Sequence, residues 1–191
     1  MTPPGDLEHG GRPASVPRIR VADEAGVEAA VAALRAGKLV GLPTETVYGL
    51  AGCALDPEVV GRIFAAKGRP ADNPLIVHVP DAAALEGLVT MVTPLASELA
   101  ATYWPGPLTL VLTASPDVPA VTRGRLTTVA VRVPDHPVAL TVLERLEQPL
   151  AAPSANRSSR PSPTQPEHVL AELGDRVALV LDGGPCVIGV E

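Results

Sequence analysis

The sequence predicts a single α/β domain in which helices cover one sheet. Three observations favour this class: segments with helical apolar spacing alternate with short apolar runs, 46% of the 191 residues are apolar, and no internal repeat is present. A chain of this length and composition can bury the core of one ordinary domain. Several links between the expected elements are short, so the sheet could be mixed rather than purely parallel.

Two helices and two strands are expected in the first half of the chain. Apolar residues recur at helical spacing from Val27 to Leu34, and Gly37 stands where a helix C-terminal glycine belongs. A second helix begins at the Asp-Pro-Glu run of residues 56–58 and ends at Lys67 and Gly68. Short apolar strands should follow the two helices, over residues 39–42 and 75–79.

The second half continues this alternation, and β-branched residues mark its strands. The expected helices cover residues 94–101 and 138–146, and the expected strands cover residues 108–112, 128–133, 150–152 and 177–181. Thr164 and Glu167 resemble a capping box that opens a last helix, which closes at Gly174. Residues 1–17 are rich in proline and glycine and predict a flexible tail, so the domain would span residues 18–191.

Composition and charge argue against several classes of protein. Aromatic residues make up only 2% of the chain and the formal net charge is -6, which disfavours both base stacking and a general nucleic-acid coat. Cys53 and Cys186 lie outside any CxxC spacing, so they predict buried thiols rather than a disulfide or a zinc site. The N-terminus lacks signal-peptide features, and no apolar run approaches the roughly 18 residues of a membrane span. A cytoplasmic protein without a membrane partner is expected.

Three loops place small, polar and charged residues just after an apolar strand, where open α/β sheets bind ligands. The first loop, GLPTETVYGL, covers residues 41–50 and gathers two threonine hydroxyls, a carboxylate and a phenol. These hydroxyls could orient a small polar substrate. The alternative is a capped turn, in which Thr44 or Thr46 bonds the backbone of a following helix.

The second loop, AKGRPADNPLIVHV, covers residues 66–79 and places two cations beside a glycine. Arginine can grip a carboxylate or phosphate through two hydrogen bonds, whereas lysine supplies a point charge, so Lys67 and Arg69 suit an anionic substrate. The alternative is that Lys67 neutralises a helix C-terminus and Arg69 is solvated. His78 lies in an apolar run, which is more typical of a hydrogen-bonded core residue than of a general base.

The third loop, LAAPSANRSSRPSPT, covers residues 150–164 and is rich in hydroxyl groups and arginines. Ser154, Asn156 and Ser162 could wrap phosphates together with Arg157 and Arg160. The chain contains neither a GxxxxGK[ST] nor a GxGxxG pattern, so the common phosphate-binding motifs do not apply. A plain surface linker is the alternative.

Taken together, these loops resemble the YrdC-like family of L-threonylcarbamoyladenylate synthases. The resemblance is carried by PTETVYGL, AKGRPADNPLIVHV, WPGPLTLVL, VAVRVPDHP and APSAN, which occur in this order within residues 22–191. It implies an open, twisted α/β fold with a deep basic cavity for ATP, L-threonine and bicarbonate. The product would be threonylcarbamoyl-AMP, released with pyrophosphate, and separate threonylcarbamoyl-transferase proteins would use it to modify tRNAs that read ANN codons.

The resemblance also implies roles for individual residues. Lys67 and Arg69 would act in catalysis near the phosphates, and Tyr48 would wall the pocket. Magnesium would arrive with ATP rather than through protein ligands. The threonine contacts would be Thr46, His78, Arg132 and the backbone of Ala152, and the ATP contacts would be Arg69, Asn73, Thr128, Ser154, Asn156 and Ser162.

One departure from the family pattern and two rival functions bear on this expectation. The chain ends in DGGPCVIGVE, whereas the family continues with a Ser-Thr-Val strand, so the domain is expected to lack that strand. The first rival is an RNA-binding module whose arginines contact phosphates, with steep salt dependence. Its candidate contacts are Arg123, Arg125, Arg157 and Arg160. The second is a carbamoyl-adenylating module like that of hydrogenase-maturation proteins, although this sequence lacks their zinc-finger and acylphosphatase segments.

Overall fold

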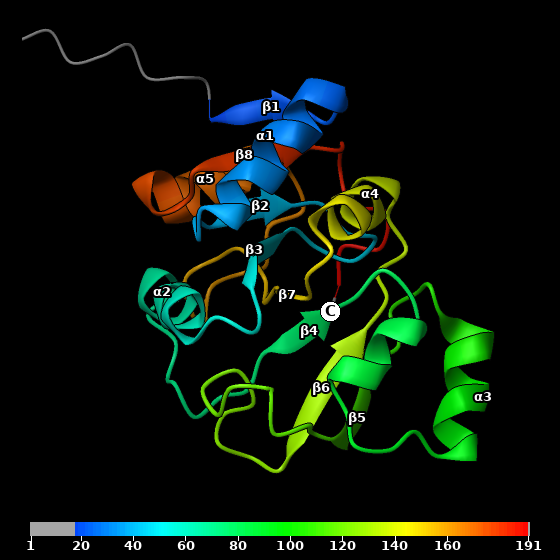
Figure 1. Ribbon diagram of the computed structural model, residues 1–191. Coiled ribbons are helices and arrows are strands. Elements are labelled where there is room, and N and C mark those ends of the chain that lie inside the picture. Colours follow the sequence, from blue (N-terminus) through cyan, green and yellow to red (C-terminus); the bar gives the residue numbers. More distant parts are fainter. Residues whose placement is uncertain (1–17, 191) are drawn as a thin grey trace, which may run out of the picture.

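The computed structural model describes residues 18–190, and the predicted tail of residues 1–17 lies outside the described residues. The strands are β1 (Ile19–Val21), β2 (Val40–Leu42), β3 (Gly49–Cys53), β4 (Ile76–His78), β5 (Leu110–Thr113), β6 (Thr128–Arg132), β7 (Leu150–Ala151) and β8 (Leu179–Asp182). They form one sheet in the order β1-β8-β2-β3-β7-β4-β6-β5 (Figure 1). Its neighbours are parallel at β1/β8, β2/β8 and β4/β6 and antiparallel elsewhere, which confirms a mixed sheet.

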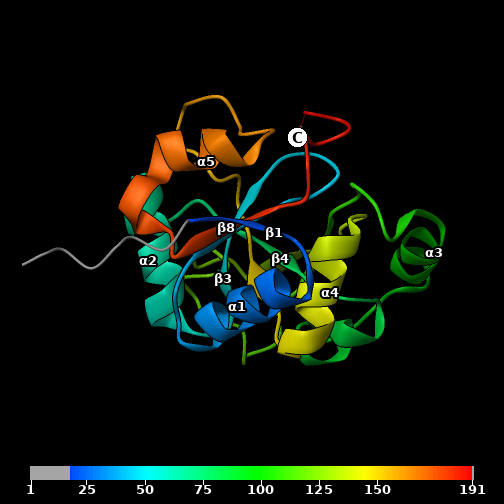
Figure 2. The same ribbon diagram turned by 90° about the horizontal axis from the view of Figure 1, so that it is seen from above.

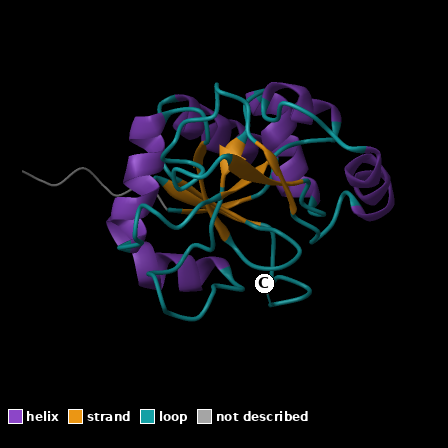
Figure 3. Ribbon diagram, turned by 90° about the horizontal axis from the view of Figure 1, so that it is seen from below, coloured by secondary structure: helices purple, strands orange, loops and turns teal. Residues whose placement is uncertain are grey.

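Helices cover both faces of this sheet (Figure 3). They are α1 (Glu24–Arg35), α2 (Pro57–Lys67), α3 (Pro94–Tyr103), α4 (Pro137–Leu146) and α5 (Pro166–Leu173), with short 3₁₀ helices at Ala83–Gly87 and Gly174–Arg176. One core cluster joins α1 and α4, and another joins α2 and α5. Side chains of β8 alternate between them, because Val180 packs with α2 and α5 whereas Leu179 and Leu181 pack with α1 and α4.

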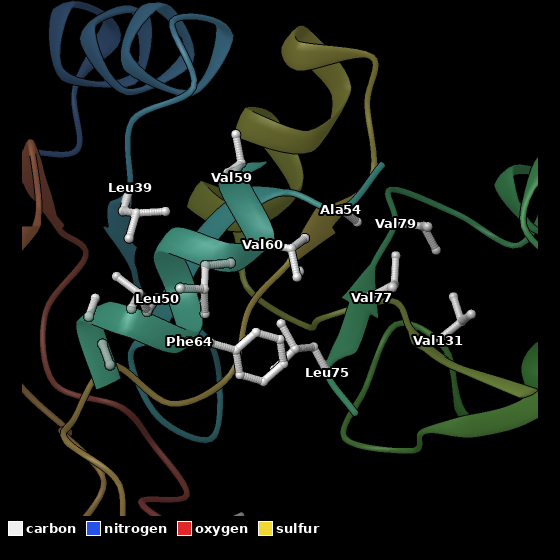
Figure 4. Packing of buried hydrophobic residues seen from close by; sticks show 14 of the residues in the cluster. Leu39, Leu50, Ala54, Val59, Val60, Phe64, Leu75, Val77, Val79 and Val131 are labelled. Carbon is white, nitrogen blue, oxygen red and sulfur yellow. The ribbon is translucent and has the colours of Figure 1, made fainter. Parts of the chain in front are cut away.

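Helix α2 shows how local sequence positions a functional loop. The Asp56 carboxylate accepts the first free amide N–H groups of the helix, from Glu58 (2.9 Å) and Val59 (3.2 Å). Gly68 ends the helix in the left-handed conformation that glycine adopts at lowest cost. The apolar side of α2 packs on the sheet (Figure 4), with Val59, Val60 and Phe64 in the same cluster as Leu50, Leu75 and Val77. As predicted, the helix therefore delivers Lys67 to the start of the second polar loop.

Two substitutions in α2 should change stability in opposite directions. Asp56→Ala removes the N-terminal cap and is expected to lower the free energy of unfolding by about 1 kcal/mol. Gly61→Ala places a methyl group in open space on the helix and should raise it by about 0.5–1 kcal/mol. Urea denaturation of both variants measures the two changes. A neutral Asp56→Ala would contradict the capping role.

The structure corrects the predicted start of one helix and adds two strands. The capping box at Thr164 and Glu167 is wrong: α5 begins at Pro166, whose fixed φ suits the first helical position, so Gln165 is the N-cap and makes no side-chain bond. Strands β1 and β3 were not predicted. Strand β3 carries two glycines and no β-branched residue, yet it is fully buried. A Cβ at Gly52 would lie 2.6 Å from a Val59 methyl group, so close packing explains the glycine.

The predicted burial of the two thiols is confirmed only in part. Cys53 is buried, whereas Cys186 is half-buried, because it lies in the segment that follows β8 along the surface. Between residues 18 and 190, no helix is long and apolar enough to cross a membrane.

Candidate functional site

The first and third polar loops lie against each other, although they are far apart in the sequence. The amide N–H of Tyr48 donates to the carbonyl of Pro163 (2.8 Å), and that of Ala155 donates to Tyr48 (2.8 Å). The N–H of Leu50 donates to Pro153 (2.7 Å). These backbone bonds explain why the third loop is a built part of the site, so the surface-linker alternative is wrong for residues 153–156.

Residues 183–190 run across the first loop (Figure 2, red beside cyan). The N–H of Ile188 donates to the carbonyl of Glu45 (2.9 Å), and the N–H of Gly189 donates to that of Thr46 (3.0 Å). The first loop is therefore held from both sides, and every residue from 41 to 50 is buried.

The two threonine hydroxyls of the first loop have different surroundings. Thr44 Oγ1 accepts from the N–H groups of Thr46 and Val47 (both 3.2 Å) and donates to the carbonyl of Val47 (2.6 Å). This is a capped turn, but strand β3 follows it rather than a helix. Thr46 Oγ1 instead accepts from Arg132 Nη2 (3.2 Å). The turn therefore aims Thr46 at the arginine.

Arg132 is the centre of a buried polar cluster. Its Nε donates to the carbonyl of Gly106 (3.1 Å), and its Nη2 lies 2.6 Å from Glu45 Oε1 in an ion pair. Only 8% and 9% of the Arg132 and Glu45 side chains are exposed, so the pair is shielded from water. His78 is the register partner of Arg132 in the parallel strands β4 and β6, which places both side chains on the same face of the sheet.

His78 is held in its neutral form. Burial, helped by the charge of Arg132 and opposed by a backbone hydrogen bond at Ile76, lowers the pKa of His78 to about 3. Its Nδ1 is buried without a hydrogen-bond partner. The interpretation of His78 as a satisfied core residue is therefore wrong for this nitrogen, while a role as a cationic group is unsupported.

This lowered pKa predicts a pH dependence of stability. His78 takes up a proton near pH 6.5 in the unfolded chain but only near pH 3 in the folded protein. The stability that depends on the neutral ring is therefore fully present above pH 6.5, and the free energy of unfolding decreases as the pH falls from 6.5 to about 3. We expect the imidazole NMR signals of His78 to stay those of the neutral ring down to about pH 4. Titration near 6.5 would contradict this environment.

Lys67 ties helix α2 to the third loop. Its ammonium group is buried and donates to the carbonyls of Ser154 and Asn156 (2.7 Å for Asn156), with Asn156 Oδ1 at 3.4 Å. Asn156 Nδ2 in turn donates to the carbonyls of Arg157 and Arg160. The alternative in which Lys67 only neutralises its helix end is therefore wrong: the lysine fixes the loop that carries Ser154.

The remaining predicted ATP contacts lie around the second loop and the third. Arg69 is half-buried and donates to the carbonyls of Asn73 (3.4 Å) and Pro74 (3.1 Å), so it is not simply solvated. Asn73 is exposed at this turn. Strand register pairs Ile76 with residue 130, which sets Thr128 level with Pro74. Arg69, Asn73 and Thr128 therefore lie at the same end of the sheet, where β4 and β6 begin. Ser162 is half-buried in the third loop.

The predicted site residues Tyr48 and Ala152 are held by hydrogen bonds to neighbouring segments. Tyr48 is fully buried, and its hydroxyl donates to the carbonyl of Gly184 (2.7 Å) and accepts from the N–H of Gly183 (3.3 Å). Burial raises the pKa of Tyr48, which keeps the phenol protonated. The N–H of Ala152 is already used by the carbonyl of Ile76 (3.1 Å), so only the Ala152 carbonyl can contact a substrate.

Two arginines of the RNA-binding rival make contacts with other residues of the chain. Arg123 donates to the carbonyls of Val118 and Leu126, and Arg160 pairs with Glu172 (3.2 Å). Arg125 and Arg157 are exposed. Of these four arginines, only Arg160 therefore has a guanidinium group paired with a carboxylate among the described residues.

Glu45 was missed as a site residue by the sequence reasoning. The available signal was an acidic residue between two threonines in a loop with no other charge. Cavities of about 450 and 340 Å³ lie beside Arg62 and beside Trp104. Among residues 18–190, no group of three or more His, Cys, Asp and Glu side chains could hold a metal ion.

Comparison with known proteins places these residues in context. The family model Sua5_yciO_yrdC, described as telomere recombination, matches residues 32–191. A threonylcarbamoyl-AMP synthase of Pyrococcus abyssi is 52% identical over 169 residues, which are 88% of this chain and 50% of that protein. One of Bacillus subtilis is 51% identical over 164 residues, 85% of this chain and 47% of that protein. The chain thus spans about half the length of these curated relatives.

The fold has a close counterpart among solved structures. The crystal structure of P. abyssi Sua5 complexed with L-threonine is 49% identical with a TM-score of 0.87, over 92% of this chain and 52% of that one. The crystal structure of E. coli YciO is 25% identical with a TM-score of 0.77, over 85% and 80% of the two chains. These matches confirm the predicted open α/β fold.

Proposed function

Because this chain belongs to the Sua5/YciO/YrdC family, we propose that it carries the catalytic domain of an L-threonylcarbamoyladenylate synthase. The observation that carries the proposal is the buried cluster in which Arg132 meets Thr46 and lies beside His78. The relative that was crystallised with L-threonine supports threonine as the substrate. In the overall reaction, threonine, bicarbonate and ATP give threonylcarbamoyl-AMP, pyrophosphate and water.

The threonine would bind through the groups around Arg132. A guanidinium matches a carboxylate through two parallel hydrogen bonds, so Arg132 would hold the substrate carboxylate. Thr46 and the Ala152 carbonyl would contact other parts of the threonine. His78 would act as an uncharged neighbour, since burial keeps its ring neutral.

The ATP would bind along the second and third loops. Lys67 would position the third loop, because its ammonium already bonds the carbonyls there, and Arg69 would face the phosphates. Asn73, Thr128, Ser154, Asn156 and Ser162 would complete this side. Magnesium, entering with ATP, would neutralise phosphate charge, which suits a site without a cluster of acidic ligands in the described part of the chain.

The chemistry would proceed in two steps without a covalent enzyme intermediate. The threonine ammonium group first gives up a proton, and the resulting amine adds to bicarbonate and loses water to give a carbamate. A carbamate oxygen then attacks the α-phosphorus of ATP and expels pyrophosphate. Positioning and electrostatic stabilisation would supply most of the rate enhancement, as in phosphoryl transfer generally.

Two further points belong to this proposal. The short-lived product would pass to separate tRNA threonylcarbamoyl-transferase proteins, and the protein would work in the cytoplasm. A nucleotidyltransferase of this kind need not bind tRNA itself, which agrees with the internal bonds of Arg123 and Arg160.

An omission experiment tests the proposal. Purified protein is incubated with magnesium, ATP, bicarbonate and L-threonine, and then with each component left out in turn, while pyrophosphate release is followed. We expect release only when all are present. Release that is independent of threonine or bicarbonate would contradict the assignment, and steeply salt-dependent RNA binding without release would favour the RNA-binding rival.

A further inference from the structure

We infer that Glu45 and Arg132 form a clasp that recognises the amino-acid substrate as a zwitterion, with Arg132 receiving its carboxylate and Glu45 its ammonium group. The inference rests on the proposed function and extends it, because neither the sequence pattern nor the comparisons give Glu45 a role. It also makes Glu45 a substrate-binding residue rather than a structural partner of the arginine.

The first observation is where unsatisfied polar atoms lie. Within residues 18–190, the buried side-chain nitrogen and oxygen atoms that lack a hydrogen-bond partner are Glu45 Oε1, Glu45 Oε2 and His78 Nδ1. All three belong to neighbours of Arg132. Buried polar atoms almost always have hydrogen-bond partners in folded proteins, so three atoms without one around the same arginine indicate a function.

The second observation is how incompletely Glu45 is bound. A buried ion pair is favourable only when further hydrogen bonds satisfy its remaining lone pairs. Glu45 Oε1 lies 2.6 Å from Arg132 Nη2, but neither carboxylate oxygen accepts a hydrogen bond of proper geometry from the described residues. Arg132, by contrast, also donates to Gly106 and Thr46. The carboxylate therefore keeps acceptor capacity that a structural partner would have used.

The third observation is the match between these groups and an α-amino acid. An ammonium group has three N–H donors, and the two Glu45 oxygens with His78 Nδ1 offer three acceptors. The neutral state of the His78 ring leaves one of its nitrogens able to accept. Beside them, Arg132 offers donors for a carboxylate. The cluster thus presents complementary charges to both ends of a zwitterion.

Charge balance explains why such a clasp would be selective. A zwitterion placed between Glu45 and Arg132 replaces one ion pair by two and adds no net charge to a buried site. A ligand with the carboxylate but no amine would bring an anion next to Glu45. A ligand with the amine but no free carboxylate would leave Arg132 beside a second cation. Both should bind much more weakly than threonine.

The backbone of the first loop is fixed in a way that lets the Glu45 side chain move from Arg132 to a substrate ammonium group. The carbonyl of Glu45 is held by the N–H of Ile188 (2.9 Å), and the next carbonyl by Gly189 (3.0 Å). The main chain is therefore fixed, and the side chain of Glu45 can turn from Arg132 towards an ammonium group by rotation about its own bonds.

The test compares ligand selectivity in the wild type, in Glu45→Gln and in Glu24→Gln as a matched control. Glu24 also pairs with an arginine, Arg145 (2.5 Å), but on the exposed surface of α1 and α4. Titration calorimetry in the presence of magnesium and ATP measures the affinity for L-threonine, for L-threonine amide and for deamino-threonine, the hydroxy acid that lacks only the amine.

We expect the wild type and Glu24→Gln to prefer threonine over deamino-threonine by about a hundredfold, the scale of leaving a buried charge unpaired. In Glu45→Gln this ratio should fall by about tenfold or more, because the anion no longer meets a carboxylate. Glu45→Asp, which keeps the charge, should retain most of the ratio. A ratio unchanged in Glu45→Gln would overturn the clasp alone, whereas a wild type that does not bind threonine would overturn the proposed function with it.

Discussion

Replacing Arg132 with glutamine is expected to lower threonine-dependent pyrophosphate release by about a hundred- to a thousandfold. The substitution removes the charge that would hold the substrate carboxylate. It also leaves Glu45 buried without its cation, since their ion pair is almost fully shielded from water. Breaking a buried pair on one side costs about 3–5 kcal/mol, so the variant should also unfold at a clearly lower denaturant concentration.

The double variant Glu45→Gln/Arg132→Gln separates these two effects. With both charges removed, no uncompensated ion is left in the core, and much of the lost stability should return. Activity should not return with it. Denaturant titration and pyrophosphate release of the single and double variants give both quantities. Full activity in a folded Arg132→Gln variant would contradict the role of this arginine.

Arg69→Ala is expected to lower the rate on the order of a hundredfold, which is the scale of losing one donor that stabilises transition-state charge. The half-buried guanidinium donates to the carbonyls of Asn73 and Pro74, at the end of the sheet where β4 begins and where the ATP phosphates are proposed to lie. Threonine affinity should change little, because the cluster around Arg132 does not include Arg69.

Arg62→Ala is the matched control for this variant. Arg62 is an exposed arginine on α2, whose Nε donates to the carbonyl of Glu58, and none of the predicted contacts involves it. Its removal should leave the rate within about twofold of the wild type. Near-normal turnover of a folded Arg69→Ala protein would show that the phosphates bind elsewhere.

The sequence predicted the helices well because their boundaries are set locally. Asp56 and Gly68 cap α2 through contacts within a few residues, and Gly37 follows α1 with the positive φ of such glycines. Strand β3 was not predicted, because its glycines are explained only by distant partners. Gly49 lies against the Cβ of Ala152 (3.2 Å), and no local pattern reveals that contact.

In the candidate site, too, the residue types could be predicted from local sequence, whereas the contacts between distant segments could not. Residue types in the three loops indicated anion binding, but their convergence depends on backbone bonds such as that of Tyr48 to Pro163. Arg132 entered only through the resemblance to a known family, since an arginine at the end of an apolar strand is not informative alone. Glu45 acquires meaning only when its distance to Arg132 is known.

The most direct test of the account is the identity of the product. The protein is incubated with magnesium, ATP, L-threonine and isotopically labelled bicarbonate, quenched at once, and examined by mass spectrometry. We predict threonylcarbamoyl-AMP that carries the label from bicarbonate and is missing when threonine is omitted. Turnover of ATP without a labelled adenylate, by protein that binds both ATP and threonine, would contradict the proposed function.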